Sequence, residues 1–270
     1  MKIIKSKPDI FVYGEAQIPS PINLSLKGYT YYVHRSKPNA VDNFRRGLAI
    51  FYLNKHKFRL TKVFGSSKFD IVWMRMENSN EVTHFCFFYS PGSHHPISVR
   101  TKFYNIFCSK FTKFASLGRV YLLGDTNARL GSLLKDKDIH GKFITNQNSH
   151  LLLNFLEFSG LTILNKVFCS GVPTYEIVNK KRSIIDLCLT NSLESVKNFI
   201  VDPTPLGANS QTCHKPLILD ISLRPHPQSP ETKTIKKRIV FSSSPERQIK
   251  MAKFTASRLS TLYNNGTSPD

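Results

Sequence analysis

The chain has 270 residues, of which 40% are hydrophobic and 11% aromatic, so it can bury a sizeable core and is not a disordered polypeptide. Its 38 Lys and Arg against 18 Asp and Glu give a formal net charge of +20, which disfavours basic partners and makes nucleic acid the leading class of partner. Five Cys without C-x-x-C spacing argue against a disulfide framework or a zinc ribbon.

The location predicted from these features is a reducing, intracellular compartment. The N-terminus lacks the apolar stretch of a signal peptide, and no run approaches the roughly 18 apolar residues of a membrane span. We therefore expect no membrane association.

Short β-type runs bounded by turn residues dominate the chain up to residue 223. They cover residues 9–13, 48–52, 71–76, 84–89, 120–123, 184–190 and 217–223. Apolar spacings of three and four predict helices over residues 99–114 and 149–159, and Gly160 is the expected C-cap of the second. Many strands with few helices predict an α+β protein whose core is sheet on sheet, flanked by helices.

Composition changes near residue 224, where a stretch rich in Pro, Ser, Lys and Arg begins. Residues 224–270 carry a net charge of +6, which leaves +14 on residues 1–223. We expect one domain over residues 1–223, followed by a basic, mostly disordered tail over residues 224–270.

Asp125 and Asn127 follow the apolar run 120–123, after Gly124. On an extended chain, residues i and i+2 face the same side, so a carboxylate and an amide would emerge together and could hold a water and a phosphate oxygen. Taken alone, the pattern Gly-Asp-x-Asn is more often an Asx-type turn.

Four other polar residues occupy strand contexts. Glu15 follows the first run, and Tyr89 ends the run 84–89. Asp186 interrupts an apolar run, where an unpaired carboxylate is costly and needs a partner, a metal or the sheet rim. His214 precedes the last run, where a single His is more often structural than catalytic.

Taken in chain order, these segments resemble the endonuclease/exonuclease/phosphatase superfamily, and most of all the apurinic-type endonuclease domain of non-LTR (LINE-like) retrotransposons. The resemblance covers residues 7–223. The segments that carry it are Lys7-Pro-Asp-Ile-Phe-Val-Tyr-Gly-Glu15, Arg46-Gly-Leu-Ala-Ile-Phe51, Phe88-Tyr-Ser-Pro91, Gly124-Asp-Thr-Asn-Ala-Arg129, Ser183-Ile-Ile-Asp-Leu187 and Ser210-Gln-Thr-Cys-His-Lys-Pro216.

The resemblance implies a four-layer αββα sandwich of the DNase I-like type, with the site where strand-to-loop junctions converge. It also implies a divalent metal, Mg²⁺ or alternatively Mn²⁺, held by the residue matching the family's glutamate, Glu15.

Further roles are implied for the remaining residues. Asp125 would orient or deprotonate the attacking water, Asn127 would position the water and the phosphate, and Tyr89 would lie near the scissile phosphate. Asp186 would join the acidic shell, and His214 would hydrogen-bond the phosphate oxygen that gains charge. DNA is the implied partner, together with a reverse transcriptase domain in a longer product, and the nucleus is the implied location.

The sequence departs from the family pattern in two places. Family members open with a strand that carries a metal-site Asn, and only six residues precede Lys7 here, so we expect this strand to be absent and a sheet edge to be left unpaired. The family's Ser-Asp-His signature reads Thr212-Cys213-His214 here. We therefore expect His214 to lack an orienting carboxylate and to be mostly neutral.

Three functions are compatible with these features. The first is an Mg²⁺-dependent endonuclease that nicks target DNA for a retrotransposon, and the second is an inactive relic of the same fold that binds nucleic acid through its charge. The third is hydrolysis of a phosphoinositide or sphingolipid phosphodiester, which the charge of +20 and the lack of a lipid-anchoring segment disfavour.

Overall fold

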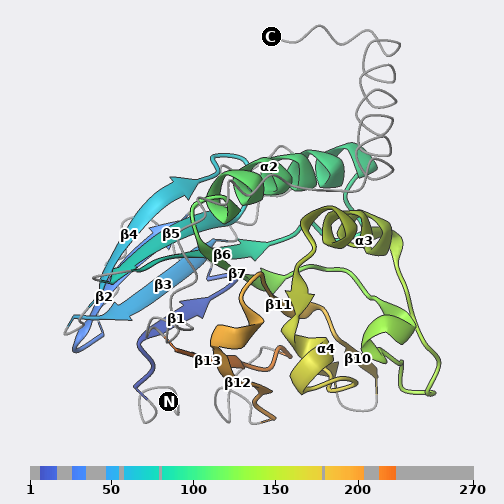
Figure 1. Ribbon diagram of the computed structural model, residues 1–270. Coiled ribbons are helices and arrows are strands. Elements are labelled where there is room, and N and C mark those ends of the chain that lie inside the picture. The colour runs from blue at the N-terminus through green and yellow to red at the C-terminus, as the bar shows by residue number, and fades with distance from the viewer. Residues whose placement is uncertain are drawn as a thin grey trace, which may run out of the picture. The chain divides into compact units, whose positions relative to one another are not determined.

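The computed structural model describes residues 7–16, 26–34, 47–54, 58–78, 81–177, 180–203 and 213–222 (Figure 1). By its internal contacts the chain separates into the units Met1–Pro225 and His226–Asp270, and every described residue belongs to the first. The predicted tail over residues 224–270 lies outside the described residues, so the predicted domain boundary stays a prediction.

A six-stranded sheet forms the centre of the described fold, in the order β4-β5-β6-β7-β11-β8. All neighbours are antiparallel except β6 and β7, which are parallel. The strands are β4 (Arg59–Gly65), β5 (Ile71–Asn78), β6 (Glu81–Tyr89), β7 (Arg119–Asp125), β8 (Thr162–Ile163) and β11 (Asp186–Thr190).

The second sheet layer consists of two separate parts. One has the order β1-β3-β2, with β1 (Ile10–Tyr13), β2 (Tyr29–His34) and β3 (Leu48–Leu53), and the other pairs β12 (Val196–Val201) with β13 (Leu217–Ile221). A small hairpin of β9 (Tyr175–Ile177) and β10 (Lys181–Ser183) stands apart from both.

Side chains along the central strands point alternately into two separate hydrophobic cores. Trp73, Phe88 and Leu122 belong to a cluster shared with the helices, whereas Met74 and Phe87 belong to a cluster shared with β1, β3 and β13. Successive side chains of a strand point to opposite faces, so one run of apolar residues supplies both layers. The predicted packing of sheet on sheet with helices outside is confirmed.

Two long helices, α2 (Ile97–Ala115) and α3 (Gln147–Ser159), pack on the helix side of the central sheet, and a short helix α4 (Leu164–Phe168) lies near β11 and β12 (Figure 1). Each long helix begins two residues earlier than predicted. For α3 the reason is an N-terminal capping box between Asn146 and Ser149. Gly160 ends α3 with φ 65°, a left-handed conformation that favours glycine, as predicted.

Four strands of the second layer, β1, β2, β12 and β13, have an unpaired edge within the described residues. β1 pairs only with β3, and β13 pairs only with β12. Every open sheet has such edges, so the predicted absence of the family's first strand stays a prediction for the described part of the chain. Among its helices, none is long and apolar enough to cross a membrane.

Candidate active site

One row of paired residues across three neighbouring strands brings the central polar residues together. Tyr89 at the end of β6 pairs with Asp125 at the end of β7, and Asp125 also pairs with Asp186 at the start of β11. Residues in register on adjacent strands point to the same face. The phenol and the two carboxylates therefore emerge side by side, although they come from distant parts of the sequence.

Close contact between β6 and β7 depends on Gly124, the residue before Asp125. A Cβ at position 124 would lie 1.9 Å from the carbonyl oxygen of Phe88, far inside van der Waals contact. The absence of a side chain there lets the two strands approach at the point where Tyr89 and Asp125 meet.

Asp186 holds the imidazole of His214. Its carboxylate oxygens lie 2.9 and 3.0 Å from His214 Nδ1. The ring of Tyr175 packs edge-on against the imidazole, with ring centroids 4.9 Å apart. His214 thus has both a hydrogen-bond partner and a packing neighbour that fix its orientation.

The protonation of His214 follows from these surroundings. Burial disfavours the cation, but the hydrogen bond and the charge of Asp186, with smaller contributions from Asp125 and Glu15, raise the pKa of His214 to about 9. The imidazole is therefore mostly cationic near pH 7.

The expectation that Cys213 leaves His214 without a carboxylate is wrong. It assumed that the orienting group must be the preceding residue, whereas β11 brings Asp186 to Nδ1 from a distant part of the chain. Cys213 instead takes part through its backbone, since its carbonyl oxygen accepts a hydrogen bond from the N–H of Glu176. The N–H of Lys215 donates to Thr174 O, so β9 and the residue before it hold the His214 segment on both sides.

Asp125 is a buried carboxyl next to a second acid. Burial raises its pKa well above the ordinary value, and the charge of Asp186 adds to this, while the backbone N–H of Asn127 and the charge of His214 oppose it. Ligand atoms of Asp125, Asp186 and His214 all lie within 4.8 Å of one another. The cluster therefore concentrates negative charge that a cation would stabilise.

Asn127 does not continue the strand as the i, i+2 pattern assumed. β7 ends at Asp125, Asn127 has φ 47°, and its backbone N–H donates to Asp125 Oδ1 over 2.6 Å. This is the Asx-type turn that was the alternative interpretation. The turn aims the Asn127 side chain toward Ser90, whose carbonyl oxygen accepts from Asn127 Nδ2 over 2.8 Å.

Glu15 follows β1, and with φ 50° it turns the chain out of that strand. It lines the same cavity as Tyr89, Asp125, Asp186 and His214, and its charge acts on Asp125 and His214. Glu15 is not one of the three residues, Asp125, Asp186 and His214, whose ligand atoms lie within 4.8 Å of one another. The structure thus brings all the sequence-predicted residues except Asn127 to one cavity, and Asn127 is bonded to Asp125 at its edge.

Sequence analysis missed residues that support this site. Asn148, which is fully buried at the start of α3, donates from Nδ2 to the carbonyl oxygens of Pro91 and Asn127. Thr174 Oγ1 accepts from the N–H groups of Ile185 and Asp186. The available signal was a pair of Asn at 146 and 148 just before an apolar helix, a pattern typical of caps rather than of sites.

A donor set of carboxylates fits a hard divalent cation such as Mg²⁺, which binds oxygen ligands. A metal-bound imidazole must be neutral, and His214 is held as the cation, so the carboxylates are the better candidates for ligands.

No family model matches the sequence, and no curated protein matches it. Solved structures do match the fold. The endonuclease domain of TRAS1, a telomere-specific non-LTR retrotransposon, has 17% identity and a TM-score of 0.59 over 83% of this chain and 90% of its own. The 3′-5′ exonuclease NExo from Neisseria meningitidis has 15% identity and a TM-score of 0.61 over 81% of this chain and 91% of its own.

A further match is the 3′ phosphatase NExo (D146N) from Neisseria bound to a product DNA hairpin, with 14% identity and a TM-score of 0.61 over 82% of this chain and 92% of that one. At these identities the likeness concerns the fold. The chain therefore shares the DNase I-like fold of these structures.

Proposed function

We propose that the protein is a metal-dependent phosphodiesterase that nicks DNA, and that it serves a retrotransposon as its target-site endonuclease. The observation that carries this proposal is the Asp186–His214 pair beside the buried Asp125, at the ends of strands in a fold shared with nucleases and a phosphatase.

Each step of hydrolysis has a candidate group. Asp125, whose pKa is raised by burial and by Asp186, accepts a proton from the attacking water more readily than an ordinary carboxylate does. The cationic His214, fixed by Asp186, donates a hydrogen bond to the phosphate oxygen that gains charge. Tyr89 and Asn127 flank Asp125 and position the phosphate.

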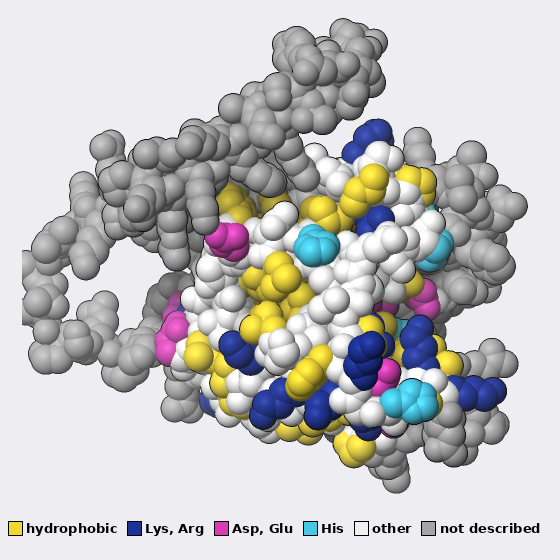
Figure 2. Space-filling model, turned by 90° about the vertical axis from the view of Figure 1, so that its right-hand side faces the viewer, with side chains coloured by type: hydrophobic (Ala, Val, Ile, Leu, Met, Phe, Trp, Pro, Cys, Tyr) yellow, Lys and Arg dark blue, Asp and Glu magenta, His cyan; other side chains and the backbone are white. Residues whose placement is uncertain are grey.

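We propose that Glu15, with the neighbouring carboxylates, holds Mg²⁺ or Mn²⁺. When bound, the metal supplies positive charge to the phosphate and its leaving oxygen. The excess of Lys and Arg over the chain suits a DNA backbone as the substrate, and such side chains gather along the lower part of the face in Figure 2. A reverse transcriptase in a longer product and a nuclear location follow from the retrotransposon role.

Nicking of supercoiled plasmid in Mg²⁺, measured for the unaltered protein and for Asp125→Asn, tests this function. We expect nicking that EDTA abolishes and that falls at least about 100-fold in Asp125→Asn. Glu157→Gln, which changes an exposed carboxylate on α3, is the matched control and is expected to leave the rate unchanged. Salt-sensitive DNA binding without any nicking in Mg²⁺ or Mn²⁺ would favour the inactive relic instead.

A further inference from the structure

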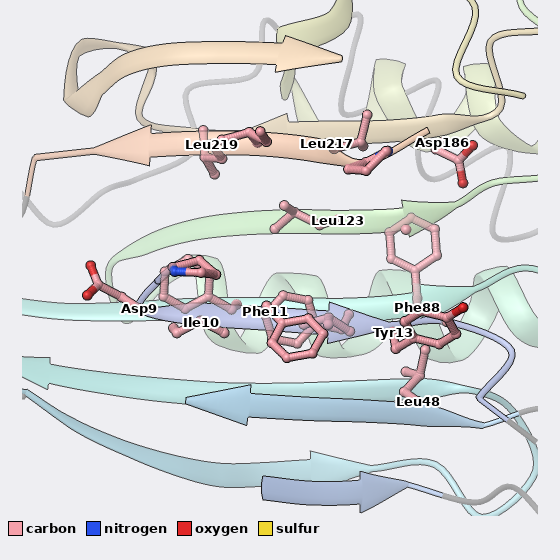
Figure 3. A pocket seen from close by; sticks show the side chains of 18 of the residues that line it. Asp9, Ile10, Phe11, Tyr13, Leu48, Phe88, Leu123, Asp186, Leu217 and Leu219 are labelled. Atoms are coloured by element: carbon pink, nitrogen blue, oxygen red, sulfur yellow. The ribbon is translucent and has the colours of Figure 1, made fainter. Parts of the chain in front are cut away.

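A groove separates the two parts of the second sheet layer. It has a volume of about 1180 Å³, and its sides are β1 and β13, which run in opposite directions (Figure 3). Its floor is apolar and includes Phe85 and Phe87 from β6 and Leu123 from β7, both strands of the central sheet. The groove is thus bounded by two strands of one sheet layer and floored by the other.

Within the described residues, both sides of the groove present a backbone edge with which no other strand pairs. The carbonyl of Asp9 accepts from the N–H of Leu53 on β3, so the alternation of an antiparallel ladder turns the backbone groups of Ile10 and Val12 away from β3 and toward the groove.

The corresponding argument applies to β13. The N–H of Asp202 donates to Pro216 O, which turns the backbone groups of Leu217 and Leu219 away from β12 and toward the groove. Within the described residues no strand pairs with either edge. Such edges accept a further strand.

On both β1 and β13, every second side chain packs against the hydrophobic cores. On β13, Leu217 and Leu219 pack against the cores, whereas Ile218 is 44% exposed. On β1, Ile10 and Val12 pack against the core shared by the two sheets. A strand placed between β1 and β13 would continue this pattern, with every second side chain on the apolar floor.

The dimensions suit one strand. Eight consecutive residues of β13 and its flank, 214–221, line the groove, and as an extended chain they span about 26 Å. Dividing the volume by that length gives a cross-section of about 45 Å², close to the roughly 48 Å² that one strand occupies at a strand spacing of about 4.8 Å and a sheet spacing of about 10 Å. The volume also exceeds the roughly 300–1,000 Å³ that is usual for small-molecule pockets.

Charge distinguishes this groove from the rest of the basic protein. Six carboxylates line it against two lysines and the cationic His214, namely Asp9, Glu15, Asp125, Asp186, Asp202, Asp220, Lys7, Lys215 and His214. Figure 3 places Asp9 at one end and Asp186 at the other. An occupant with basic residues at its ends is therefore favoured over an acidic or neutral one.

We propose that the groove binds an extended segment of another polypeptide, apolar at alternate positions and basic at its ends, as an added β-strand. Because β1 and β13 run in opposite directions, the segment pairs parallel to one and antiparallel to the other (Figure 3). Backbone hydrogen bonds to both edges supply much of the affinity, and the alternate apolar side chains supply the selectivity.

Fluorescence anisotropy with the full chain tests this proposal. The probe is a labelled nine-residue peptide in which Val and Thr alternate between terminal Lys residues. We expect saturable binding that weakens at least about tenfold when the peptide is N-methylated at alternate residues, because the side chains are kept and the backbone donors are lost. Leu219→Asp should weaken binding by a similar factor. The matched control is Ile200→Asp, at an exposed position of β12 that does not line the groove, and it should weaken binding by less than about twofold.

The peptide variants keep the test decisive if Leu219→Asp fails to fold. Equal binding of the methylated and unmethylated peptides would overturn the proposal. Binding of the peptide only after deletion of residues 1–6 would also overturn it, because the chain's own N-terminus would then be the occupant. A dimer that is seen by size-exclusion chromatography and is abolished by Leu219→Asp would overturn it as well, because a second copy of the chain would then be the occupant. No step of this test depends on nuclease activity, so it is independent of the proposed function.

Discussion

Replacing Asp186 with Asn should remove the negative charge that stabilises the His214 cation. The substitution keeps the size of the side chain and removes the negative charge that faces His214 Nδ1 at 2.9 Å. In the unaltered protein, the rise of the His214 pKa from 6.5 to about 9 corresponds to about 3 kcal/mol in favour of the cation.

Burial already disfavours that cation, and Asp186 provides the two largest effects that oppose burial. In Asp186→Asn the pKa of His214 should therefore fall by at least about 2 units, to near or below its ordinary 6.5. At pH 7.5 the cationic fraction should drop from nearly all molecules to a minority.

Two measurements follow from this shift. NMR titration of the His214 ring signals, assigned with His214→Gln, reports the pKa in each protein. Plasmid nicking in Mg²⁺ at pH 7.5 should fall by roughly 10²–10⁴, by analogy with other carboxylate-oriented histidines. A His214 pKa near 6.5 in the unaltered protein, or the same pKa in both proteins, would refute the reasoning whatever the nicking rates.

Four other outcomes are expected. Cys213→Asp should change the nicking rate by less than about threefold, because Asp186 already accepts a hydrogen bond from Nδ1 of His214. A tenfold gain would show that a carboxylate at position 213 orients His214 better than Asp186 does. His84 is 1% exposed, and burial together with the charge of Arg75 lowers its pKa to about 4. The folded protein therefore favours the neutral imidazole, so the contribution of His84 to the free energy of unfolding is complete above pH 6.5 and is lost as the pH falls from 6.5 to 4. Denaturant unfolding measures this effect as the decrease in the free energy of unfolding between pH 7 and pH 4. That decrease should be about 3 kcal/mol smaller in His84→Leu than in the unaltered protein, and equal decreases would contradict a lowered pKa of His84. DNA affinity should fall at least about 100-fold between 50 and 200 mM salt in an anisotropy titration, and a flat response would remove counterion release as the main contribution. Finally, the unpaired edges of β1 and β13 should keep the thermal midpoint below about 65 °C by scanning calorimetry and make the isolated protein prone to aggregate.

Every strand and helix predicted from the sequence is present, because each is a continuous apolar run or a clear three-four periodicity. Among the missed elements, β12 and α4 lack such a signal, whereas β2 and β4 were missed although their residues are typical of strands. In β12, Lys197 and Asn198 interrupt the alternation and the ladder shifts register there, and α4 has only five residues. β12 is defined by its partner β13 more than by its own sequence.

The site was predictable in its members but not in their contacts. Resemblance supplied Tyr89, Asp125, Asp186 and His214, yet adjacency in sequence led to the wrong partner for His214. The right partner depends on the pairing of β11 with β7 and on β9 holding the His214 segment, and both are long-range contacts that no local pattern encodes.

The row that joins Tyr89, Asp125 and Asp186 can form only after distant parts of the chain have paired. A parallel pairing of β6 with β7 needs the whole crossover through α2 to be in place, and the pairing of β11 with β7 closes a still longer loop. A slip of one residue between β11 and β7 would turn Asp186 to the opposite face of the sheet and leave His214 without its partner. Under the proposed function, nicking activity should therefore return on refolding only after this register has formed, and species with near-native circular dichroism but shifted strands would be inert.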